Sequence, residues 1–576
     1  MAATSPTPSQ FSSAALLLLL AHASSPAAAA TAAAATAAAA RAAPALPSSS
    51  RLRTEYLEAP VCIDEPRPRF SWAPLAGRRG TAVASYRVVV TALTDGSVAW
   101  DSGLVPSNAT TNIAYAGVPL ASDADYSWTV SWTDDEGAAS SPVSAAFSTA
   151  LFSPADWRSA QWVGGDFIRA EFNVSGSFSG PRVRRARLFL SSPGWYKAFI
   201  NSAVVDDHEL GGFTTFEERI LYDAVDVTSL VVPGCNTLGL LIGGGWWART
   251  SGLVNRPHDP STRVVLSVTD DAGAITYFAS TLGGGGIAPG TLPLAFTSSQ
   301  SPVTSADVYG GESYDARLEQ PGWAACGFVP PAGAAAWVPA PAVALDPLAP
   351  NNFTGGPFIS ANTVQIRVDE DFPLVAVTQL PSGDLVADFG QHVTKNRSHA
   401  ARFLLLTLNP DQSRPAHRNL AGFPSIAVIC PGGPQTITLR LAESVDADGD
   451  IIDAYGGTIA FTCAGTGAVE HHTPVFHYSG YRYARVTNWP GTLSPGPGLV
   501  SHFVHADVAP TGAFGSSSTL LNKVQHATRF AALSNLMSTP TDCPTREKHG
   551  YLGDGGLAGK CHRPPPATTA HGTHSL

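Results

Sequence analysis

The sequence is organised around a polar stretch close to its carboxyl end, Pro540-Thr-Asp-Cys-Pro-Thr-Arg-Glu-Lys-His-Gly-Tyr-Leu-Gly-Asp554. Asp542, Arg546 and Glu547 stand at i, i+4 and i+5, and Asp554 follows seven residues after Glu547. Prolines stiffen the start of the stretch, and glycines near its end allow the backbone to turn. Such a segment is better suited to a loop that presents polar groups to a ligand than to a continuous helix.

Acidic groups gathered around one arginine form a set whose pKa values can be pushed apart by burial and by charge. One carboxyl group can then stay protonated as an acid, while its neighbours stay ionised and bind hydroxyl groups. On spacing alone, a solvated polar loop is the more frequent outcome for such a cluster. The sequence around the cluster therefore decides between the two interpretations.

Residues 535–554 resemble the signature of the bacterial-type α-L-rhamnosidases, glycoside hydrolase family 78, in both order and spacing. In that family the signature opens an (α/α)6 barrel. The resemblance implies that Glu547 is the general acid and that Asp542, Arg546 and Asp554 bind rhamnose. It implies no metal and no cofactor, and the expected partners are rhamnose-containing glycosides or polysaccharides.

The family inverts the configuration at the anomeric carbon. Inversion requires an acid that protonates the leaving oxygen and a base that activates water, with the two carboxyl groups about 6.5–9.5 Å apart. Arg546 would lower the pKa of Glu547 by charge, so burial or the Asp542 and Asp554 carboxylates would have to raise it. The family's base is a glutamate far downstream, so we expect residues 1–576 alone to show little or no turnover.

The composition describes a lightly charged globular protein with many turns. Of 576 residues, 44% are hydrophobic and 14% are charged, with 54 glycines and 46 prolines, which favours short strands over long helices. The length predicts about four domains. A net charge of −10 without a basic patch argues against nucleic acid as a partner.

The amino-terminal residues 1–50 form a low-complexity segment with a short apolar run at 16–20, followed by Ala- and Ser-rich sequence. This pattern predicts a secretory signal peptide and a secreted protein. The Ala-rich tract is too weakly apolar to predict a stable membrane span. Glycosylation sequons, which are compatible with secretion, begin at Asn108, Asn173, Asn352 and Asn396.

Three β modules are expected between this segment and the motif. Residues 51–152 alternate apolar and polar residues in short runs, which indicates an immunoglobulin- or fibronectin-like sandwich. Residues 153–345 indicate a jelly-roll-like module. Residues 355–510 resemble the concanavalin-like domain of the rhamnosidases. The pattern typical of strands is lost at 396–421, where we expect an insertion that is disordered or poorly packed.

Several aromatic and charged residues of these modules have two interpretations. Trp195, Trp246 and Trp247 could stack on a sugar face, but sandwiches bury most of their tryptophans, so packing is favoured. Arg482 lies between two tyrosines and is expected to form a structural ion pair or stack.

The spacing of apolar residues becomes helical in 511–560, which we interpret as the start of the catalytic (α/α)6 domain. Ser517 or Ser518 is the expected N-cap. An apolar stripe at helical spacing follows, formed by Leu520, Val524, Ala527 and Ala531. The tail 561–576 has no apolar period and is expected to be unstructured.

Seven cysteines are spread through the chain without a Cys-x-x-Cys pair, so a structural zinc site is not expected, although one or two disulfides are possible. Cys543 lies in the motif, where the resemblance implies a scaffold role. His471 and His472 are adjacent and would point to opposite faces of a strand, which argues against a metalloenzyme.

The predicted fold class is therefore multidomain and mainly β, with successive β-sandwich modules followed by the start of an (α/α)6 barrel. The predicted function is that of an α-L-rhamnosidase-like glycoside hydrolase. A non-catalytic carbohydrate-binding protein built from β sandwiches remains an alternative, and so does a different glycosidase built on similar modules.

Overall fold

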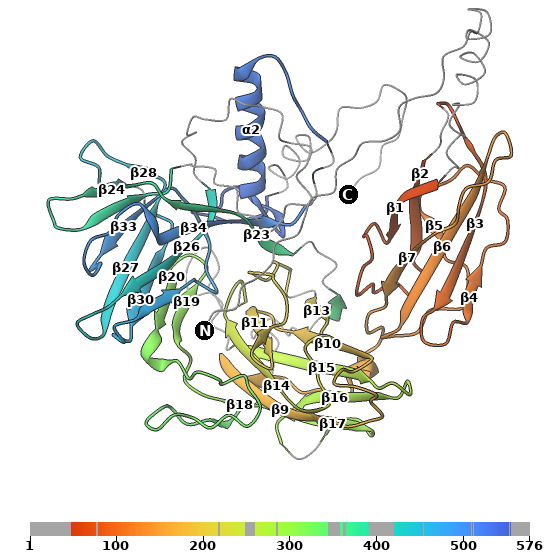
Figure 1. Cartoon of the computed structure of the whole chain (residues 1–576), viewed down its shortest axis with the longest axis horizontal. Coiled ribbons are helices and arrows are strands. Elements are labelled where there is room, and N and C mark those ends of the chain that lie inside the picture. Colours follow the sequence, from red (N-terminus) through yellow and green to blue (C-terminus); the bar gives the residue numbers. More distant parts are fainter. Residues whose placement is uncertain are drawn as a thin grey trace, which may run out of the picture.

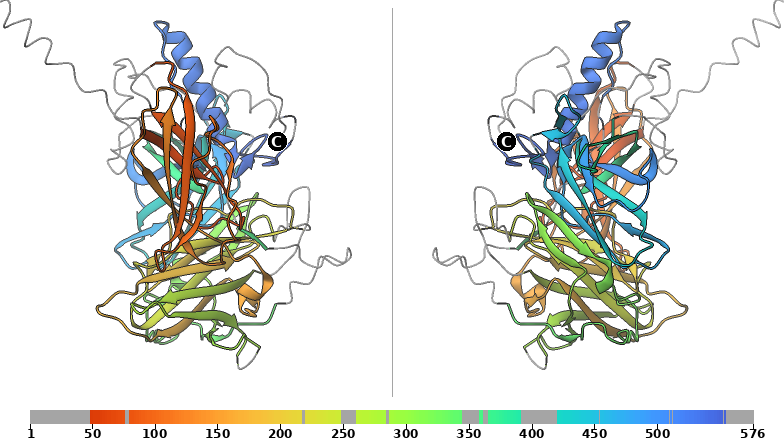
Figure 2. Two further views of the ribbon diagram at one scale, coloured as in Figure 1. Left: turned by 90° about the vertical axis from the view of Figure 1, so that its right-hand side faces the viewer. Right: turned by 90° about the vertical axis from the view of Figure 1, so that its left-hand side faces the viewer.

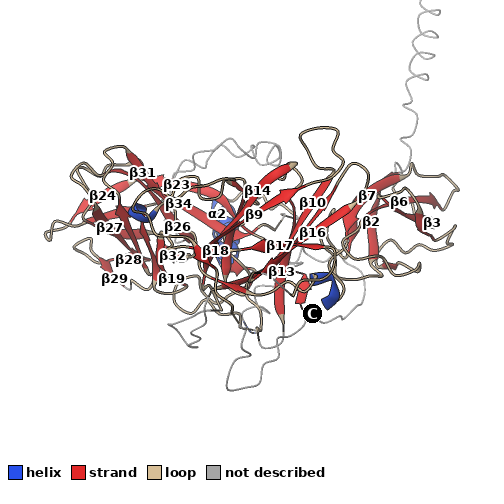
Figure 3. Cartoon of the chain, turned by 90° about the horizontal axis from the view of Figure 1, so that it is seen from below, coloured by secondary structure: helices blue, strands red, loops and turns tan. Residues whose placement is uncertain are grey.

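The computed structural model arranges the described chain as three β units and one terminal α-helix (Figure 1). Seen from below, the second β unit lies between the first and the third (Figure 3). The prediction of a multidomain, mainly β fold is confirmed. The structure describes residues 48–75, 79–216, 219–247, 260–283, 286–343, 358–360, 365–390, 420–452, 454–508, 510, 512–551 and 553.

The first β unit is a sandwich of two antiparallel sheets. One contains β1 (Ser48–Thr54), β2 (Arg69–Leu75) and β5 (Ile113–Ala114), and the other contains β4 (Val98–Asp101), β3 (Val83–Ala92), β6 (Asp125–Asp134) and β7 (Val143–Ser148). Every second residue of β6 is buried, which is the period of a sheet with one core face. Phe70, Trp128 and Phe147 pack together in this core, so the tryptophan serves packing.

The second β unit follows a short 3-10 helix, η1 (Pro154–Trp157), and consists of two facing sheets. One sheet contains β8 (Val163–Gly164), β10 (Arg185–Ser191), β13 (Ile220–Asp226), β15 (Ser261–Thr269), β16 (Ile275–Thr281), β17 (Thr291–Ala295) and β22 (Phe358–Ser360). The other contains β9 (Phe167–Val174), β11 (Trp195–Ile200), β12 (Ala203–Val204), β14 (Gly234–Gly243), β18 (Thr297–Ser298) and β21 (Val338–Pro339). Aliphatic side chains from both sheets form one continuous core.

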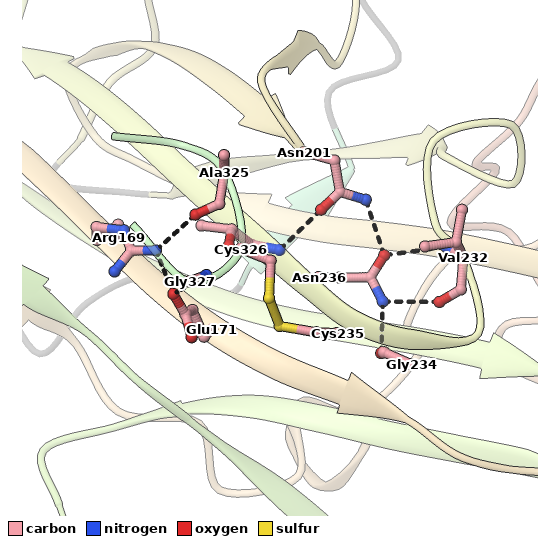
Figure 4. The surroundings of a disulfide bond; sticks show 11 residues. Arg169, Glu171, Asn201, Val232, Gly234, Cys235, Asn236, Ala325, Cys326 and Gly327 are labelled. Atoms are coloured by element: carbon pink, nitrogen blue, oxygen red, sulfur yellow. Dashed lines mark hydrogen bonds and ion pairs between the residues drawn. A yellow bond between two sulfur atoms is a disulfide. The ribbon is translucent and has the colours of Figure 1, made fainter. Parts of the chain in front are cut away.

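A disulfide between Cys235 and Cys326 ties the start of β14 to the segment that follows the 3-10 helix η2 (Ala316–Leu318) (Figure 4). Beside it, Arg169 donates to the carbonyl oxygen of Trp323 at 2.7 Å and pairs with Glu171 at 2.6 Å. Glu171 and the two sulfurs lie close enough together to hold a metal ion. Sulfurs joined in a disulfide are not thiolate ligands, so this cluster is a cross-link and not a metal site.

The third β unit is also a two-sheet sandwich. One sheet contains β19 (Val303–Asp307), β20 (Gly311–Asp315), β30 (Thr458–Cys463), β27 (Gln435–Ala442), β33 (Tyr483–Thr487), β25 (Leu385–Asp388) and β24 (Ala376–Gln379). The other contains β23 (Ile366–Leu374), β34 (Gly496–Ala506), β26 (Leu420–Ile429), β31 (Val469–His472) and β32 (Ser479–Tyr481), and a small hairpin joins β28 (Ser444–Val445) to β29 (Ile451–Ile452). A second disulfide, Cys430–Cys463, crosses its core.

Two predicted structural roles in the third β unit are confirmed. Arg482 donates to both carboxylate oxygens of Asp388 at 2.8 and 2.6 Å, which is a structural ion pair. His472 is buried and His471 is exposed, as expected for neighbours on opposite faces of a strand. Burial lowers the pKa of His472 to about 3, so this imidazole stays neutral in the folded protein.

The second and third β units exchange chain segments. Strands β19 and β20 lie within the predicted module 153–345, yet β20 pairs in parallel with β30 of the third unit. Conversely, β22 lies within the predicted module 355–510 and pairs in parallel with β13 of the second unit. Because each sandwich contains strands from the chain segment predicted for the other, the chain crosses between the two sandwiches and ties them together.

Side chains of both units also pack into one shared cluster, which we call the seam. It consists of Trp195, Leu210, Phe216, Trp246 and Trp247 from the second unit, Val303, Val308, Ile366, Ala421, Phe423, Phe476, Tyr478 and Val504 from the third, and Met537 beyond them. The three tryptophans of the seam are buried, so packing is their role, as the sequence favoured.

The single described α-helix, α2 (Thr519–Ser534), follows the third unit and rises above it (Figures 1 and 2). Ser518 caps it by accepting a hydrogen bond from the Leu521 amide, as predicted. The predicted apolar stripe is not covered by other elements of the described chain: Leu520 and Val524 are 69% and 54% exposed. The helix instead packs through Phe530 and Leu533, against Phe372, Leu420 and Phe503.

Some predicted features lie outside the described residues: most of the segment 1–50, nearly all of the insertion 396–421, the tail 561–576, and Asp554 in the motif. Among the described residues, no helix is both long enough and apolar enough to cross a membrane.

Candidate functional site

The motif loop, residues 541–551, leaves a small hairpin that anchors it to the second β unit. The hairpin joins β35 (Leu536–Met537) to β36 (Thr539–Pro540) directly after α2. Met537 is buried in the seam. The Ser538 hydroxyl accepts a hydrogen bond from the Phe213 amide of the second unit at 3.1 Å. The entry to the motif loop is therefore fixed by packing and by a hydrogen bond.

The motif loop is closed on itself by Asp542. The Asp542 amide donates to the His549 carbonyl oxygen at 2.9 Å, and the His549 amide donates to Asp542 Oδ1 at 2.9 Å. A carboxylate that accepts a backbone N–H across a turn holds that turn in shape. Asp542 was predicted as a rhamnose ligand, and in the structure one of its oxygens is committed to closing the loop.

The middle of the motif loop lies on the third β unit. The Pro544 carbonyl oxygen accepts from the Gly480 amide at 3.0 Å, and the Thr545 hydroxyl donates to Glu443 Oε1 at 2.5 Å. The approach is close at Gly480, where an added Cβ atom would lie 2.4 Å from Thr545 Oγ1 and 2.6 Å from Pro544 Cγ. Glycine at position 480 therefore makes room for the motif loop.

The predicted acid, Glu547, is held at the outer side of the motif loop. Arg546 Nη2 lies 2.9 Å from its Oε1, and the Tyr551 hydroxyl donates to its Oε2 at 2.8 Å. The Glu547 side chain is 32% exposed and that of Arg546 is 65% exposed. The hydrogen bond and the charge of Glu547 raise the pKa of the Arg546 guanidinium. The carboxylate is thus oriented by two donors and still reachable from solvent.

Two side chains form hydrogen bonds with the backbone of Glu547. Its amide donates to Cys543 Sγ at 3.3 Å, which is consistent with the predicted scaffold role of this cysteine. Its carbonyl oxygen accepts from the Tyr309 hydroxyl at 2.7 Å. Tyr309 belongs to the turn between β19 and β20, so these two strands bring its hydroxyl to the backbone of Glu547.

Lys548 is the part of this site that sequence reasoning missed. Its side chain is buried, and Nζ donates to the carbonyl oxygens of Val308 and Tyr478 at 2.5 and 2.6 Å. Burial lowers the pKa of Lys548 to about 7. A lysine in a polar loop gives no local signal of burial, because lysine is rarely buried.

The structure thus brings together Asp542, Arg546 and Glu547 in one loop, with direct contact between the last two. Asp554, the fourth predicted residue, lies outside the described residues. Two hollows, of about 380 and 160 Å³, lie elsewhere, along the first β unit and where it meets the second. The acid therefore stands on the surface of the described chain and not in either hollow.

Four segments of the chain match known protein families in succession. Residues 49–153 match the Rha78A-like N-terminal immunoglobulin domain, and residues 181–351 match the α-L-rhamnosidase N-terminal domain. Residues 417–505 match the bacterial α-L-rhamnosidase concanavalin-like domain, and residues 509–563 match the bacterial α-L-rhamnosidase six-hairpin glycosidase domain. The last match contains the motif loop.

Individual proteins give the same result. An α-L-rhamnosidase of Alteromonas sp. (strain LOR) is 26% identical over 528 residues, which cover 86% of this chain and 51% of that protein. The structure of an α-L-rhamnosidase from Dictyoglomus thermophilum has a TM-score of 0.74 at 25% identity, covering 89% of this chain and 55% of the other. An α-L-rhamnosidase from Aspergillus terreus gives 0.70 at 25% identity, covering 87% and 54%. The chain spans about half the length of these relatives.

Proposed function

We propose that this chain, which belongs to the bacterial α-L-rhamnosidase family, supplies the acid-bearing loop of a glycoside hydrolase. The proposed reaction is the inverting hydrolysis of terminal, non-reducing α-L-rhamnose from glycosides or polysaccharides. The observation that carries the proposal is the Glu547 carboxylate, which two donors orient toward solvent on a loop fixed to the seam.

In this proposal Glu547 protonates the oxygen of the leaving group. A general acid must carry a proton when the substrate is bound, and Arg546 Nη2 lies 2.9 Å from Oε1 in the described arrangement. Sugar hydroxyl groups that draw Arg546 away from Oε1 would free this oxygen to face the leaving group. Arg546 is exposed enough to make that shift. The same movement would bind the sugar and prepare the acid.

Asp542 has a double role in the proposal. Its Oδ1 accepts from the His549 amide and keeps the motif loop closed. A carboxylate has a second oxygen with free lone pairs, which can accept from a rhamnose hydroxyl. Loss of Asp542 would therefore affect both loop shape and sugar binding, whereas loss of Arg546 would affect sugar binding and the orientation of Glu547.

The experiment that tests this function separates binding from cleavage. L-rhamnose is titrated into the unmodified protein, Glu547→Gln and Arg546→Met by calorimetry, with D-mannose as the control sugar, and cleavage of a natural rhamnoside is measured in parallel. We expect Glu547→Gln to keep L-rhamnose binding and Arg546→Met to lose it. Since residues 1–576 alone are expected to show little or no turnover, binding decides the test, and loss of L-rhamnose binding in Glu547→Gln would mark the residue as a ligand instead.

One observation favours a second candidate, a carbohydrate-binding protein without hydrolysis. Both oxygens of Glu547 accept from donors in the described arrangement, as the carboxylate of a sugar-binding residue would. Under this alternative, Glu547→Gln weakens L-rhamnose binding instead of preserving it. The same titration therefore decides between the two candidates.

We further propose that the protein is secreted. The support is the signal-like segment 1–50 together with two disulfides, Cys235–Cys326 and Cys430–Cys463, because such bonds persist in oxidising compartments. Expression with the native amino terminus should release a protein that lacks the apolar run at 16–20. Recovery of the protein only inside cells, with the run intact, would contradict secretion.

A further inference from the structure

We propose that Lys548 is a positioning residue that locks the motif loop onto the third β unit and thereby fixes the direction of Glu547. The inference rests on the proposed function of Glu547 as the acid. Lys548 itself faces the protein interior and does not touch the sugar.

The first argument is where the lysine binds. Its Nζ donates to the carbonyl oxygen of Val308, in the turn between β19 and β20, and to that of Tyr478, which directly precedes β32. Strands β19 and β20 belong to one sheet of the third unit, and β32 belongs to the other. A single side chain from the motif loop therefore joins both sheets of the sandwich.

The second argument is that the lysine side chain is buried and that its Nζ faces aromatic rings. Its side chain is only 2% exposed, and its Nζ lies 4.5 Å from the ring centroid of Tyr478 and 5.6 Å from that of Tyr309. Ring faces attract an ammonium group and partly offset the loss of water. Carbonyl oxygens and aromatic rings contact this group directly, and the charge of Asp307 also favours its protonated form.

The third argument links the lysine to the acid. Lys548 has a φ of 56°, in the left-handed region that a lysine rarely adopts, so the chain reverses at this point. Glu547 consequently faces solvent while the next side chain faces inward. Tyr309 completes the arrangement, because its ring faces the lysine while its hydroxyl donates to the Glu547 carbonyl oxygen. If the lysine withdrew, the residue that carries the acid would lose its inner anchor.

The position of Lys548 explains an otherwise costly choice of residue. Removing a lysine from water is unfavourable, and a local backbone strain is added to that cost. Such costs persist where the surrounding structure or the function requires them. An apolar side chain would fill the same space, but it would leave the carbonyl oxygens of Val308 and Tyr478 without this donor.

The test compares Lys548→Met and Lys548→Arg in the full chain, with Lys523→Met on the exposed face of α2 as the control. Methionine fills the space without donating, whereas arginine still donates. Amide exchange is followed by mass spectrometry in peptides that cover 541–551 and in peptides of the first β unit. L-rhamnose affinity is measured by calorimetry on the same proteins.

We expect Lys548→Met to exchange at least about tenfold faster in 541–551 and to bind L-rhamnose about tenfold more weakly, because hydrogen bonds to a charged group contribute at that level. Lys548→Arg should restore most of the protection, and Lys523→Met should match the unmodified protein. Tyr309→Phe, a milder change, should speed exchange in the same peptides and keeps the test valid if Lys548→Met does not fold.

Unchanged exchange in 541–551 of Lys548→Met, or of Tyr309→Phe where the first variant does not fold, would overturn the inference. Equal L-rhamnose affinity in the unmodified protein and Lys548→Met would overturn it as well, and would leave the proposed function standing. Failure of the unmodified protein to bind L-rhamnose would contradict the proposed function instead, and the exchange comparison would still decide whether Lys548 anchors the loop.

Discussion

Helix α2 and the motif loop 541–551 are neighbours in the chain, but they are attached to the protein in opposite ways. The helix is regular and capped, yet Leu520 and Val524 are exposed and only its last turns pack against the third β unit. The motif loop is irregular, yet it makes hydrogen bonds to the third unit and buries Lys548 there, and the hairpin that precedes it bonds to the second unit. Regular secondary structure and firm anchoring are thus separate properties.

This difference shows what positions the acid. Helix α2 delivers the chain to the motif loop, whereas the seam and the strand exchange determine where Glu547 stands. Tyr309 and Val308, which form hydrogen bonds with the motif loop, come from a segment more than two hundred residues earlier in the sequence. Changes in the anchors should therefore disturb the site more than changes in the helix.

The largest expected effect concerns pH and the buried Lys548. Its pKa is about 7 in the folded protein, below the ordinary value of 10.5 that applies when the chain is unfolded. Between these values the unfolded state binds more protons, so stability rises as the pH increases from about 7 to about 10. Each unit of separation corresponds to about 1.4 kcal/mol, so the contribution is several kcal/mol at most.

The measurement for this prediction is the thermal unfolding midpoint of the unmodified protein and of Lys548→Met at pH 7 and pH 9.5. The midpoint of the unmodified protein should gain more on alkalisation than that of the variant. An equal change in both proteins would mean that Lys548 does not titrate differently in the two states.

The second effect concerns Met537, the residue of the hairpin that enters the seam. Met537→Ala leaves a cavity among buried aromatic side chains and should destabilise the anchored region by about 2–5 kcal/mol. Chemical denaturation followed by tryptophan fluorescence reports on this region, because Trp195 and Trp247 lie in the same cluster. A loss below about 0.5 kcal/mol would show that the hairpin does not hold the motif loop.

The third effect concerns Gly480. Gly480→Ala places a Cβ atom against Thr545 and Pro544, so the motif loop must shift, at a cost of about 1–3 kcal/mol. Gly512→Ala is the matched control, because an added Cβ atom there meets nothing within 4 Å. Faster amide exchange in 541–551 of the first variant and not of the second is the expected result, and similar exchange in both would contradict it.

The smallest effect concerns the exposed face of α2. Val524→Ser changes a side chain that is 54% exposed and should alter stability by no more than about 0.5 kcal/mol. Its L-rhamnose affinity should equal that of the unmodified protein. A large loss of affinity would mean that the helix, and not its anchors, positions the site.

Local features of the fold could be predicted from the sequence. Alternation identified the strands of the first unit, and Ser518 was correctly identified as a possible cap of α2. Packing of Trp195, Trp246 and Trp247 followed from the usual burial of tryptophan in sandwiches. The order and spacing of the motif placed Asp542, Arg546 and Glu547 in one loop, and their assigned roles stay predictions.

Features that depend on distant partners could not be predicted. Nothing local in β19 and β20 reveals that β20 pairs with β30, because that pairing joins segments far apart in the chain. The stripe of Leu520 and Val524 has helical spacing, but spacing does not say whether a partner covers it. The burial of Lys548 follows from the carbonyl oxygens that meet there, and those come from other elements.

The most direct measurement of the central claim is amide exchange in 541–551 with and without L-rhamnose. If Glu547 and Arg546 form the sugar-binding face of an anchored loop, L-rhamnose should slow exchange in this segment, D-mannose should not, and peptides of the first β unit should be unaffected by either. Identical exchange in 541–551 with and without saturating L-rhamnose would contradict the account.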